Sequence, residues 1–328
     1  MGTIIVSSNL KGGVTKTSST INLGVGLTLL GKRVLLVDAD LQGNTTAALG
    51  IEPSKLEHTT YTLITGQSTF EQAIKQTYFD KVSKQFIDAS NQEILARLTI
   101  PPENIVSGPD LLPCNIAAAR AENDLIHNPS WGSLLRTALQ TYRQNYDYIF
   151  IDTHPDLGKL TVNAFIVADY VLIPTVPEQW PTQGLIILCN SINEARTINP
   201  NLKIVGIVFS RVRYAEHTRL MEYIQDKLVP TLNKQFPRLH LSCFEAYTNE
   251  SAAFINATNR RSCVLLTHPI DAISVSYWAL LTELLRKIQS PDLSLAQVQF
   301  ERAMMYYNKQ REQSKVGSRK TQNRKEEE

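Results

Sequence analysis

Glycine, lysine and threonine lie together near the start of the chain in a pattern suited to binding phosphate. The run at 11–17 reads Lys-Gly-Gly-Val-Thr-Lys-Thr and follows a short apolar stretch. In such a turn, successive backbone N–H groups and the N-terminus of the following helix point at an anion. We expect Lys16 to reach the β- and γ-phosphates of a nucleotide and the Thr17 hydroxyl to bind Mg²⁺. The predicted nucleotide-binding residues are Lys11, Gly12, Gly13, Val14, Thr15, Lys16, Thr17 and Ser18.

The loop departs from the common phosphate-loop pattern G-x-x-x-x-G-K-[ST]. Leu10 and Thr15 stand at the two glycine positions of that pattern, and the chain instead follows [KR]-G-G-x-x-K-[ST] with Lys11 at its start. The sequence therefore predicts a variant phosphate loop rather than the common form.

The elements around this loop form a predicted βαβ unit. Thr3–Ser8 is a β-branched run typical of a buried strand, and Lys16–Leu30 reads as a helix that stops at Gly31. Arg33–Asp38 is a second, nearly continuous apolar strand. Continuous apolar strands indicate a parallel sheet that is covered on both faces. We predict an α/β fold with a doubly wound, mostly parallel sheet flanked by helices.

The rest of the chain continues this alternation of strands and helices. Further strands are predicted within Asn104–Leu112 and at Tyr148–Asp152, Tyr170–Pro174 and Ile204–Phe209. Further helices are predicted at Ala117–Ile126, Trp131–Tyr142, Thr182–Thr197, His217–Leu228, Ala272–Ile288 and, in pieces, Thr60–Gln76. This order agrees with one large α/β domain.

We divide the chain into three parts. Residues 1–290 form the predicted phosphate-loop domain, with an insertion or surface lobe near 78–104, where the sequence is polar and lacks a clear period. Residues 291–308 have a helical period. Residues 309–328 form a tail in which Lys309–Lys325 carries seven basic residues and one acidic residue, and we expect this tail to be disordered.

Composition limits the classes of function. The chain has 328 residues, of which 43% are apolar, and its net charge of +2 does not by itself indicate nucleic-acid binding. The absence of an apolar stretch of about 18 residues or of a charged leader predicts a cytoplasmic protein without a membrane span. The four cysteines are too widely spaced for a zinc site, and we interpret them as buried thiols: Cys114, Cys189, Cys243 and Cys263.

The variant loop resembles the deviant Walker A motif of the ParA/MinD family of ATPases. Other stretches resemble motifs of that family in the same order, namely Val34–Leu49, Tyr146–Gly158, Val171–Gly184 and Ser262–Pro269. The resemblance runs from Thr3 to about Ile288 and leaves Tyr78–Glu103 unmatched. The stretch Leu41–Asn44 is similar to the ParA (Soj-like) branch, and no clear amphipathic membrane helix ends the chain. The resemblance implies a P-loop NTPase fold of the deviant Walker A type.

The resemblance also implies roles for individual residues. Lys11 matches a lysine that reaches the partner's phosphates in a homodimer with ATP sandwiched between the subunits. Asp40 matches a carboxylate that positions or activates the attacking water, so the implied catalytic residues are Lys11, Lys16 and Asp40. Asp152 would hold Mg²⁺ through water, and Asp38 would support the metal or the loop without touching the ion. The implied cofactors are ATP and Mg²⁺.

Several positions depart from the family's pattern. Thr15 replaces the usual glycine before the loop lysine, where glycine admits a positive φ and a close approach to phosphate. His154 and Asp156 stand where the family often has Pro and Ser, and Leu41 stands where Pro is common. We therefore expect slow ATP hydrolysis that a partner stimulates.

Proteins of the ParA branch bind DNA without sequence preference, and the resemblance implies the same here. Phosphate contacts need clustered cations, and the candidates are Arg211, Arg213, Arg219, Arg260 and Arg261. The basic tail is a second candidate. Only two residues precede Thr3, so we do not expect a helix-turn-helix there that would read an operator.

Three functions stay open at this point. The first is an ATPase that partitions plasmid or chromosomal DNA with a centromere-binding, ParB-like partner. The second is a ParA-like protein that positions a protein cargo on the nucleoid through a cargo adaptor. The third is a reductase ATPase with an iron–sulfur cluster, which needs closely placed cysteines that the sequence does not show. The first two imply a cytoplasmic, nucleoid-associated protein.

Overall fold

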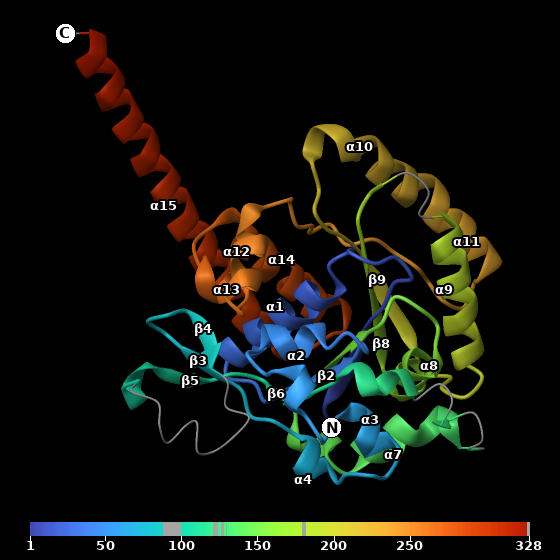
Figure 1. Ribbon diagram of the computed structural model, residues 1–328. Helices are drawn as coiled ribbons and strands as arrows, with labels where there is room; N and C mark the ends of the chain where they lie inside the picture. Colours follow the sequence, from blue (N-terminus) through green and yellow to red (C-terminus); the bar gives the residue numbers. More distant parts are fainter. Residues whose placement is uncertain (88–99, 121–123, 126–127, 129, 179–181, 327–328) are drawn as a thin grey trace.

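The central sheet has six parallel strands (Figure 1). The computed structural model describes residues 1–328 except 88–99, 121–123, 126–127, 129, 179–181 and 327–328. The six strands are β1 Thr3–Ser7, β2 Val34–Ala39, β6 Asp110–Leu112, β7 Tyr148–Thr153, β8 Tyr170–Thr175 and β9 Lys203–Phe209. Their order is β6-β2-β7-β1-β8-β9, and every neighbouring pair is parallel. The predicted parallel sheet is confirmed.

Helices cover both faces of this sheet. Neighbouring residues of β1, Ile4 and Ile5, are fully buried in separate apolar clusters on opposite faces. One face is covered by α3 Thr60–Ile64, α4 Phe70–Ala73, α7 Leu134–Gln140, α8 Lys159–Val167, α9 Thr182–Ala195 and α11 Val229–Gln235. The other is covered by α1 Lys16–Leu29, α12 Ala252–Asn259, α13 Val264–Thr267 and α14 Ala272–Lys287. Burial on both faces explains why the strands are continuous apolar runs.

Short elements complete the described part of the chain. Two further helices are α2 Asn44–Ala48 and α10 Tyr214–Tyr223. Single turns of 3-10 helix lie at Pro53–Lys55, Pro102–Asn104, Ile116–Arg120, Trp131–Ser133 and Arg143–Asn145. A π-helical turn at Ile224–Leu228 joins α10 to α11, so the helix predicted at His217–Leu228 is longer at both ends. Pro230 lies in the first turn of α11, where its missing N–H interrupts the regular hydrogen-bond ladder.

The described part of the helix predicted at Ala117–Ile126 begins with a 3-10 turn and includes Asp124, which is helical. Its first residues form the 3-10 turn Ile116–Arg120, in which only Ala118 is buried. Residues 121–123 and 126 of the prediction lie outside the described residues.

The segment near 78–104 contains two strands that its sequence did not indicate, and they pair with a third strand that lies within the predicted stretch Asn104–Leu112. Here β3 Tyr78–Asp80, β4 Gln85–Ile87 and β5 Ile105–Ser107 form an antiparallel sheet in the order β4-β3-β5. Each strand has three residues, which is too short to reveal an alternating pattern. The backbone N–H of Phe86 donates to the carbonyl oxygen of Arg261 at 3.1 Å and so ties this sheet to the main domain.

The end of the chain is one helix, α15 Leu293–Glu326, which projects from the body in Figure 1. Its first turns bury Ala296 and Ala303 in the apolar cluster that includes α14. The structure continues this helix past the expected boundary at 308 to Glu326, and the expected disorder of 309–328 stays a prediction. The tail is rich in Lys, Arg, Gln and Glu and contains no proline, and these residues favour helix without tertiary contacts.

Candidate nucleotide-binding site

The glycine-containing loop joins β1 to the N-terminus of α1 at the carboxyl edge of the sheet. Gly13 and Thr15 both have positive φ, at 73° and 68°, and Thr15 is the N-cap residue of α1. The side chain of Asn9 holds the loop in place, because its Nδ2 donates to the Pro174 carbonyl at 2.7 Å and its Oδ1 accepts from the Lys11 N–H at 3.1 Å. The loop is therefore preformed at a helix N-terminus, as anion binding requires.

Lys16 lies at the base of this loop and is buried. Its ammonium group makes a long hydrogen bond of 3.4 Å to the carbonyl oxygen of Lys11. Burial lowers the pKa of Lys16, while the negative charges of Asp152 and Asp40 act in the opposite direction. A buried cation with one long hydrogen bond is stabilised by the negative charge of a bound phosphate. The predicted role of Lys16 therefore fits its position.

Thr17 and Asp152 face each other across the loop. The Thr17 hydroxyl donates to Asp152 Oδ2 at 2.6 Å, and the Thr45 hydroxyl donates to the same oxygen at 2.8 Å. The other oxygen, Oδ1, is buried and has no hydrogen-bond partner in the described structure. Burial raises the pKa of Asp152 to about 6. An unpartnered carboxylate oxygen beside a threonine hydroxyl suits Mg²⁺, which prefers oxygen ligands and keeps several waters.

Asp38 is fully buried behind this pair and holds the loop after β2. Its Oδ1 accepts from the Asp40 N–H at 3.1 Å, and its Oδ2 accepts from the N–H and hydroxyl of Thr46 at 2.9 and 2.7 Å. Burial and the charge of Asp152 raise the pKa of Asp38 to about 7. Of the two supporting roles expected for Asp38, the hydrogen bonds favour support of the loop.

Asp40 follows β2 and reaches the same cavity. Its Oδ1 accepts from the Gln42 N–H at 2.9 Å and lies 3.8 Å from Nε2 of His154. The neighbouring β2 and β7 are in register, with Asp38 opposite Asp152. The carboxyl ends of parallel strands therefore bring together acidic residues that lie more than a hundred positions apart.

Lys11 points away from the loop's own cavity. Its ammonium group is ion-paired with Glu178, which follows β8, and it is not among the described residues that line the cavity. Lys16 and Lys11 thus face different directions, although they lie five positions apart. The outward position agrees with the expectation that Lys11 acts on a second subunit.

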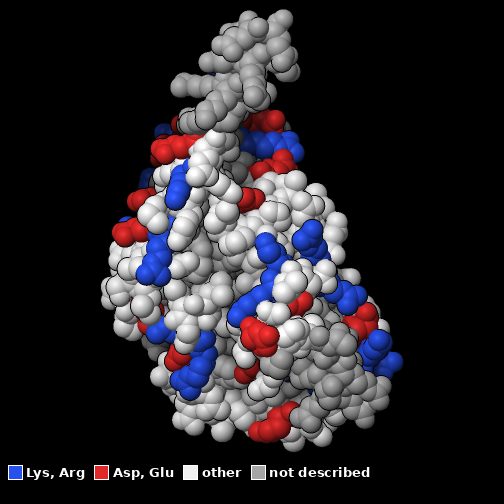
Figure 2. Space-filling model, turned by 90° about the vertical axis from the view of Figure 1, so that its left-hand side faces the viewer, with Lys and Arg blue, Asp and Glu red and all other residues white. Residues whose placement is uncertain are grey.

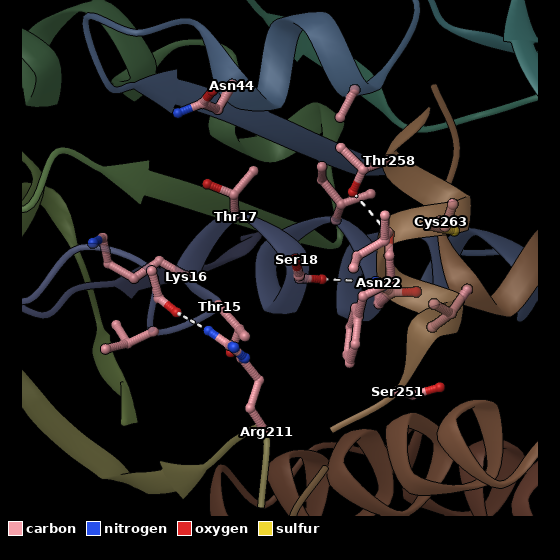
Figure 3. A pocket seen from close by; sticks show the side chains of 18 of the residues that line it. Thr15, Lys16, Thr17, Ser18, Asn22, Asn44, Arg211, Ser251, Thr258 and Cys263 are labelled. Carbon is pink, nitrogen blue, oxygen red and sulfur yellow. Dashed lines mark hydrogen bonds between the residues drawn. The ribbon is translucent and has the colours of Figure 1, made fainter. Parts of the chain in front are cut away.

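A cavity of about 910 Å³ lies beside the loop, as Figure 3 shows. The loop from Gly12 to Ser18 forms one wall, and Asp40, His154 and Asn44 contribute to it. The opposite wall is formed by α12 and the start of α13, with Phe254, Ile255, Thr258 and Cys263. Its volume lies in the range of small-molecule and cofactor sites.

Sequence reasoning missed the α12 wall of this cavity. The segment 243–262 has no strong period, and its one usable signal is Ser251, whose side chain caps α12 by accepting from the Ala253 N–H at 3.2 Å. That signal predicts a helix start but not its position beside the loop. Asn44 and Thr45 were also missed as site residues, because their role depends on where the loop after β2 folds back.

The five arginines proposed to contact DNA lie in different parts of the structure. Arg211 lines the cavity and donates to the Gly13 carbonyl at 3.5 Å (Figure 3). It also pairs with Glu250 at 3.0 Å. Arg213 pairs with Glu250 and with Glu216, and the two arginines lower the pKa of Glu250 to about 2. These two arginines therefore form an ion-pair cluster at the rim of the cavity.

The other three candidate arginines are exposed. Arg219 lies on α10, whereas Arg260 and Arg261 lie at the C-terminal end of α12. In Figure 2, lysine and arginine side chains on the face drawn are interspersed with acidic ones and do not form one continuous field. The candidates thus form two separate groups, at α10 and at α12.

The four cysteines are free thiols, and all but Cys243 are buried. Among the described residues, no group of three or more His, Cys, Asp or Glu side chains is arranged to hold a metal ion. That finding is compatible with Mg²⁺ at Thr17 and Asp152, since Mg²⁺ bound with a nucleotide takes much of its shell from water and phosphate. Within the same described residues, no helix has the length and apolar character needed to cross a membrane.

One family model and two relatives among known proteins are similar to this chain. A family model described as an AAA domain matches residues 2–204. The chain is 35% identical over 246 residues to the sporulation initiation inhibitor protein Soj of Bacillus subtilis, covering 73% of this chain and 87% of Soj. It is 33% identical over 210 residues to the chromosome partitioning protein ParA of Caulobacter vibrioides, covering 63% of this chain and 68% of ParA.

A solved structure shows a similar fold. The cobyrinic acid a,c-diamide synthase of Mycobacterium smegmatis, with an ATP analog and magnesium bound, aligns with a TM-score of 0.58 and 28% identity. The alignment covers 69% of this chain and 80% of the synthase. The fold of the present chain is therefore similar to one that holds an ATP analog and magnesium in the synthase.

Proposed function

The chain belongs to the ParA/MinD family of phosphate-loop ATPases, and from this premise we propose that it is an ATP-dependent, dimerising switch that partitions plasmid or chromosomal DNA. Its cofactors are ATP and Mg²⁺. The observation that carries the proposal is the convergence of Lys16, Thr17 and Asp40 on one cavity at the N-terminus of α1.

Each of these groups has a distinct part in ATP hydrolysis. The loop N–H groups and Lys16 bind the β- and γ-phosphates and stabilise the charge that develops during phosphoryl transfer. Thr17 and Asp152 would hold Mg²⁺, which neutralises phosphate charge when bound. Asp40 orients the attacking water from the end of β2. The apolar wall at Phe254 and Ile255 offers a surface for the base.

The proposed dimer depends on Lys11. The Lys11 side chain is 52% exposed, so it can reach a neighbouring subunit. Lys16 is buried and serves its own loop. In a sandwich of two chains around two nucleotides, Lys11 would add a cation to the partner's phosphates. ATP then becomes part of the interface, so its hydrolysis releases the dimer.

We propose that the dimer binds DNA through its exposed arginines. Arg219 on α10 and the pair Arg260 and Arg261 after α12 are exposed, while Arg211 and Arg213 are engaged with Glu250. One chain offers few phosphate contacts, and a dimer doubles them on one duplex. The basic residues of α15 are a second candidate surface.

Partition requires a partner that marks the DNA to be moved. A ParB-like, centromere-binding protein is the expected partner, and it would stimulate slow hydrolysis on a nucleoid-associated, cytoplasmic ATPase. The relatives of this chain named for chromosome partitioning favour this function. Positioning of a protein cargo through an adaptor is the alternative, and it would use the same ATP and DNA cycle.

The test measures ATP hydrolysis and DNA binding together. We expect slow hydrolysis that non-specific duplex DNA or the partner increases, and duplex binding with ATP but not with ADP. Binding should fall steeply with salt and depend little on base sequence, because the contacts are to phosphates. Equal DNA binding with ADP and with ATP, or no DNA binding at low salt with either nucleotide, would contradict the proposal that ATP controls DNA binding.

Variants locate the DNA surface. Replacing Arg260 and Arg261 together with alanine should weaken binding to all duplexes alike and spare ATP binding. The matched comparison replaces Arg213 and Arg219, of which Arg213 is already paired with Glu250. Truncation after Lys309 tests α15. A loss confined to the truncation would place the DNA surface on α15 instead of on the two arginine groups.

A further inference from the structure

The side chain of Arg211 extends from the segment after β9 into the cavity beside the phosphate loop (Figure 3). Its Nη1 donates to the Gly13 carbonyl oxygen at 3.5 Å, which is a long and weak hydrogen bond. Lysine and arginine contribute two side chains to the described lining of this cavity, namely Lys16 and Arg211. Arg211 is therefore a second cation at the place where the proposed function puts the phosphates.

Backbone pairing holds Glu250 beside Arg211. The Val212 N–H donates to the Thr248 carbonyl oxygen at 2.8 Å, and the Glu250 N–H donates to the Val212 carbonyl oxygen at 3.1 Å. The two carboxylate oxygens of Glu250 are shared between two arginines, since Oε1 accepts from Arg211 at 3.0 Å and Oε2 accepts from Arg213. Because each arginine has its own oxygen, Glu250 keeps one ion-pair partner if Arg211 moves away.

The ion pair between Arg211 and Glu250 can be exchanged for a stronger one. The two side chains are 43% and 35% exposed, and ion pairs this open to solvent contribute little to stability. A guanidinium has five N–H donors, and in the described structure those of Arg211 serve Gly13 and Glu250. The phosphates of a nucleotide carry several negative charges, and their oxygens match the forked donors of a guanidinium. A triphosphate in the cavity therefore attracts Arg211 more strongly than one exposed carboxylate does.

The backbone of Arg211 is in a conformation that non-glycine residues rarely adopt. Its φ is 53°, and its N–H donates to the hydroxyl of buried Thr248 at 3.4 Å. Such backbone strain is found most often at ligand-binding and active sites. In Arg211 the strained backbone places the guanidinium beside the loop.

We propose that Arg211 binds the phosphates of the nucleotide held by its own chain, and that Glu250 is the counter-ion it leaves when ATP binds. This inference rests on the proposed function, in which the loop and Lys16 bind the same phosphates. Lys16 reaches them from the base of the loop, and Arg211 reaches them from the side of β9. Arg213 stays paired with Glu250 and is not among the described residues that line the cavity. Arg211 thus belongs to the nucleotide site and not to the DNA surface.

The first test measures ATP affinity by calorimetry with Mg²⁺ and without DNA. We expect Arg211→Ala to lower the affinity by about 10-fold or more, the effect of losing one charge-assisted hydrogen bond. Arg211→Lys keeps the charge but not the fork and should recover part of this loss. The affinity of Arg211→Ala should also depend less on salt, because one ionic contact is lost. The control Arg238→Ala, at an exposed arginine outside the described lining, should leave both quantities unchanged.

A loss of affinity without a change in salt dependence would assign Arg211 to the base or the ribose and would overturn the inference. An unchanged ATP affinity together with weaker DNA binding would place Arg211 on the DNA surface and would overturn it as well.

A double-mutant cycle tests the exchange with Glu250. Glu250→Gln should tighten ATP binding by up to about 5-fold, the effect of one exposed ion pair that no longer competes with the phosphates. In the Arg211→Ala background the same substitution should have little effect, since the competing pair is already absent. An equal gain in both backgrounds would show that Glu250 acts on the nucleotide through its own charge, which contradicts the exchange.

Arg213→Ala separates phosphate binding from support of the cavity rim. This variant removes the other ion-pair partner of Glu250, and we expect a much smaller loss of ATP affinity than in Arg211→Ala. A loss of the same size would mean that the ion-pair cluster only supports the rim, and the inference would fail.

The proposed function has a separate outcome. If Lys16→Ala abolishes ATP binding and folded Arg211→Ala keeps full affinity, only the inference about Arg211 fails. If the unaltered chain does not bind ATP, both fail.

Discussion

The ammonium group of Lys11 is ion-paired with the carboxylate of Glu178 within one chain, although 167 positions separate them. Both side chains are about half exposed, at 52% and 49%. The lysine proposed to bind the partner's phosphates therefore already has an anionic partner in the single chain. In the proposed sandwich dimer, this ion pair would be exchanged for contacts with the second nucleotide.

Removing the competing carboxylate should favour the dimer. An exposed ion pair contributes about 0–1 kcal/mol, and each of the two subunits gives up one such pair, so Glu178→Gln should tighten ATP-dependent dimerisation by up to about 30-fold. Lys11→Ala should stay monomeric or fail to hydrolyse ATP. Sedimentation with ATP and Mg²⁺ measures both, with Glu222→Gln on α10 as the control. Weaker dimerisation of Glu178→Gln would mean that Glu178 supports the dimer interface instead.

Asp40→Ala should trap the ATP-bound dimer. Its carboxylate reaches the cavity without contacting Lys16 or Thr17 through a hydrogen bond in the described structure, so its loss should spare binding and stop hydrolysis. Light scattering with ATP and Mg²⁺ should show a dimer that persists while the unaltered chain returns to the monomer. A monomeric Asp40→Ala would count against the sandwich arrangement.

Lys16→Ala should abolish measurable ATP binding. The buried ammonium is the cation directed into the loop, and an alanine leaves the phosphate charge without it. Isothermal calorimetry measures the affinity, and circular dichroism verifies that the variant is folded. Lys55→Ala, at an exposed lysine away from the cavity, is the matched control. Unchanged affinity in folded Lys16→Ala would show that the loop is not the phosphate site.

Thr15→Gly should stabilise the protein and speed hydrolysis. Thr15 has a φ of 68°, a region that costs a β-branched residue about 1–2 kcal/mol and that glycine adopts freely. Its hydroxyl is also buried without a hydrogen-bond partner in the described structure. Allowing for the greater entropy of glycine in the unfolded chain, we expect the free energy of unfolding to rise by up to about 1 kcal/mol. Urea denaturation measures this change.

A second substitution at the same position separates backbone strain from the hydroxyl group. Thr15→Ala removes the unpartnered hydroxyl but keeps a Cβ at positive φ, so it should recover less stability than Thr15→Gly. If both variants are less stable than the unaltered chain, the threonine hydroxyl makes a contact that outweighs the strain of its backbone.

The free energy of unfolding of the nucleotide-free protein should decrease as pH rises from about 4 to about 7. Burial raises the pKa of Asp38 to about 7 and that of Asp152 to about 6, above the range of a carboxyl group in the unfolded chain. The folded state therefore binds more protons than the unfolded state in this window, and the free energy of unfolding decreases as pH rises. Each group contributes at most about 1.4 kcal/mol per pH unit.

The isosteric variant Asp38→Asn isolates one of these groups. It removes the buried charge and keeps a carbonyl oxygen that can accept from Thr46. We expect a shallower dependence of the unfolding free energy on pH, measured by urea denaturation from pH 4.5 to 7.5. Asp226→Asn, at an exposed aspartate, should keep the full slope. A rise in stability with pH in the unaltered chain would contradict the pKa shifts.

Local pattern alone determined the phosphate loop and the kind of sheet that carries it. An apolar run, a glycine-containing turn and Lys16-Thr17 at a helix start are contiguous in sequence, so their chemistry can be read without knowing the fold. The same holds for the strands, because burial on both faces requires continuous apolar residues. The three-residue strands β3 and β4 lie in a polar segment and contain too little pattern to be recognised.

Tertiary structure decided which groups from distant parts of the chain lie next to one another. The register of β2 and β7 sets Asp40 beside His154, the fold of the chain after β8 sets Glu178 against Lys11, and α12 closes the cavity opposite the loop. Arg211, which the sequence presented as a cation for DNA, contacts Gly13 and Glu250 within the chain. Sequence periodicity reports which face of a segment is buried, whereas these contacts depend on how separate segments are aligned by strand pairing and helix packing.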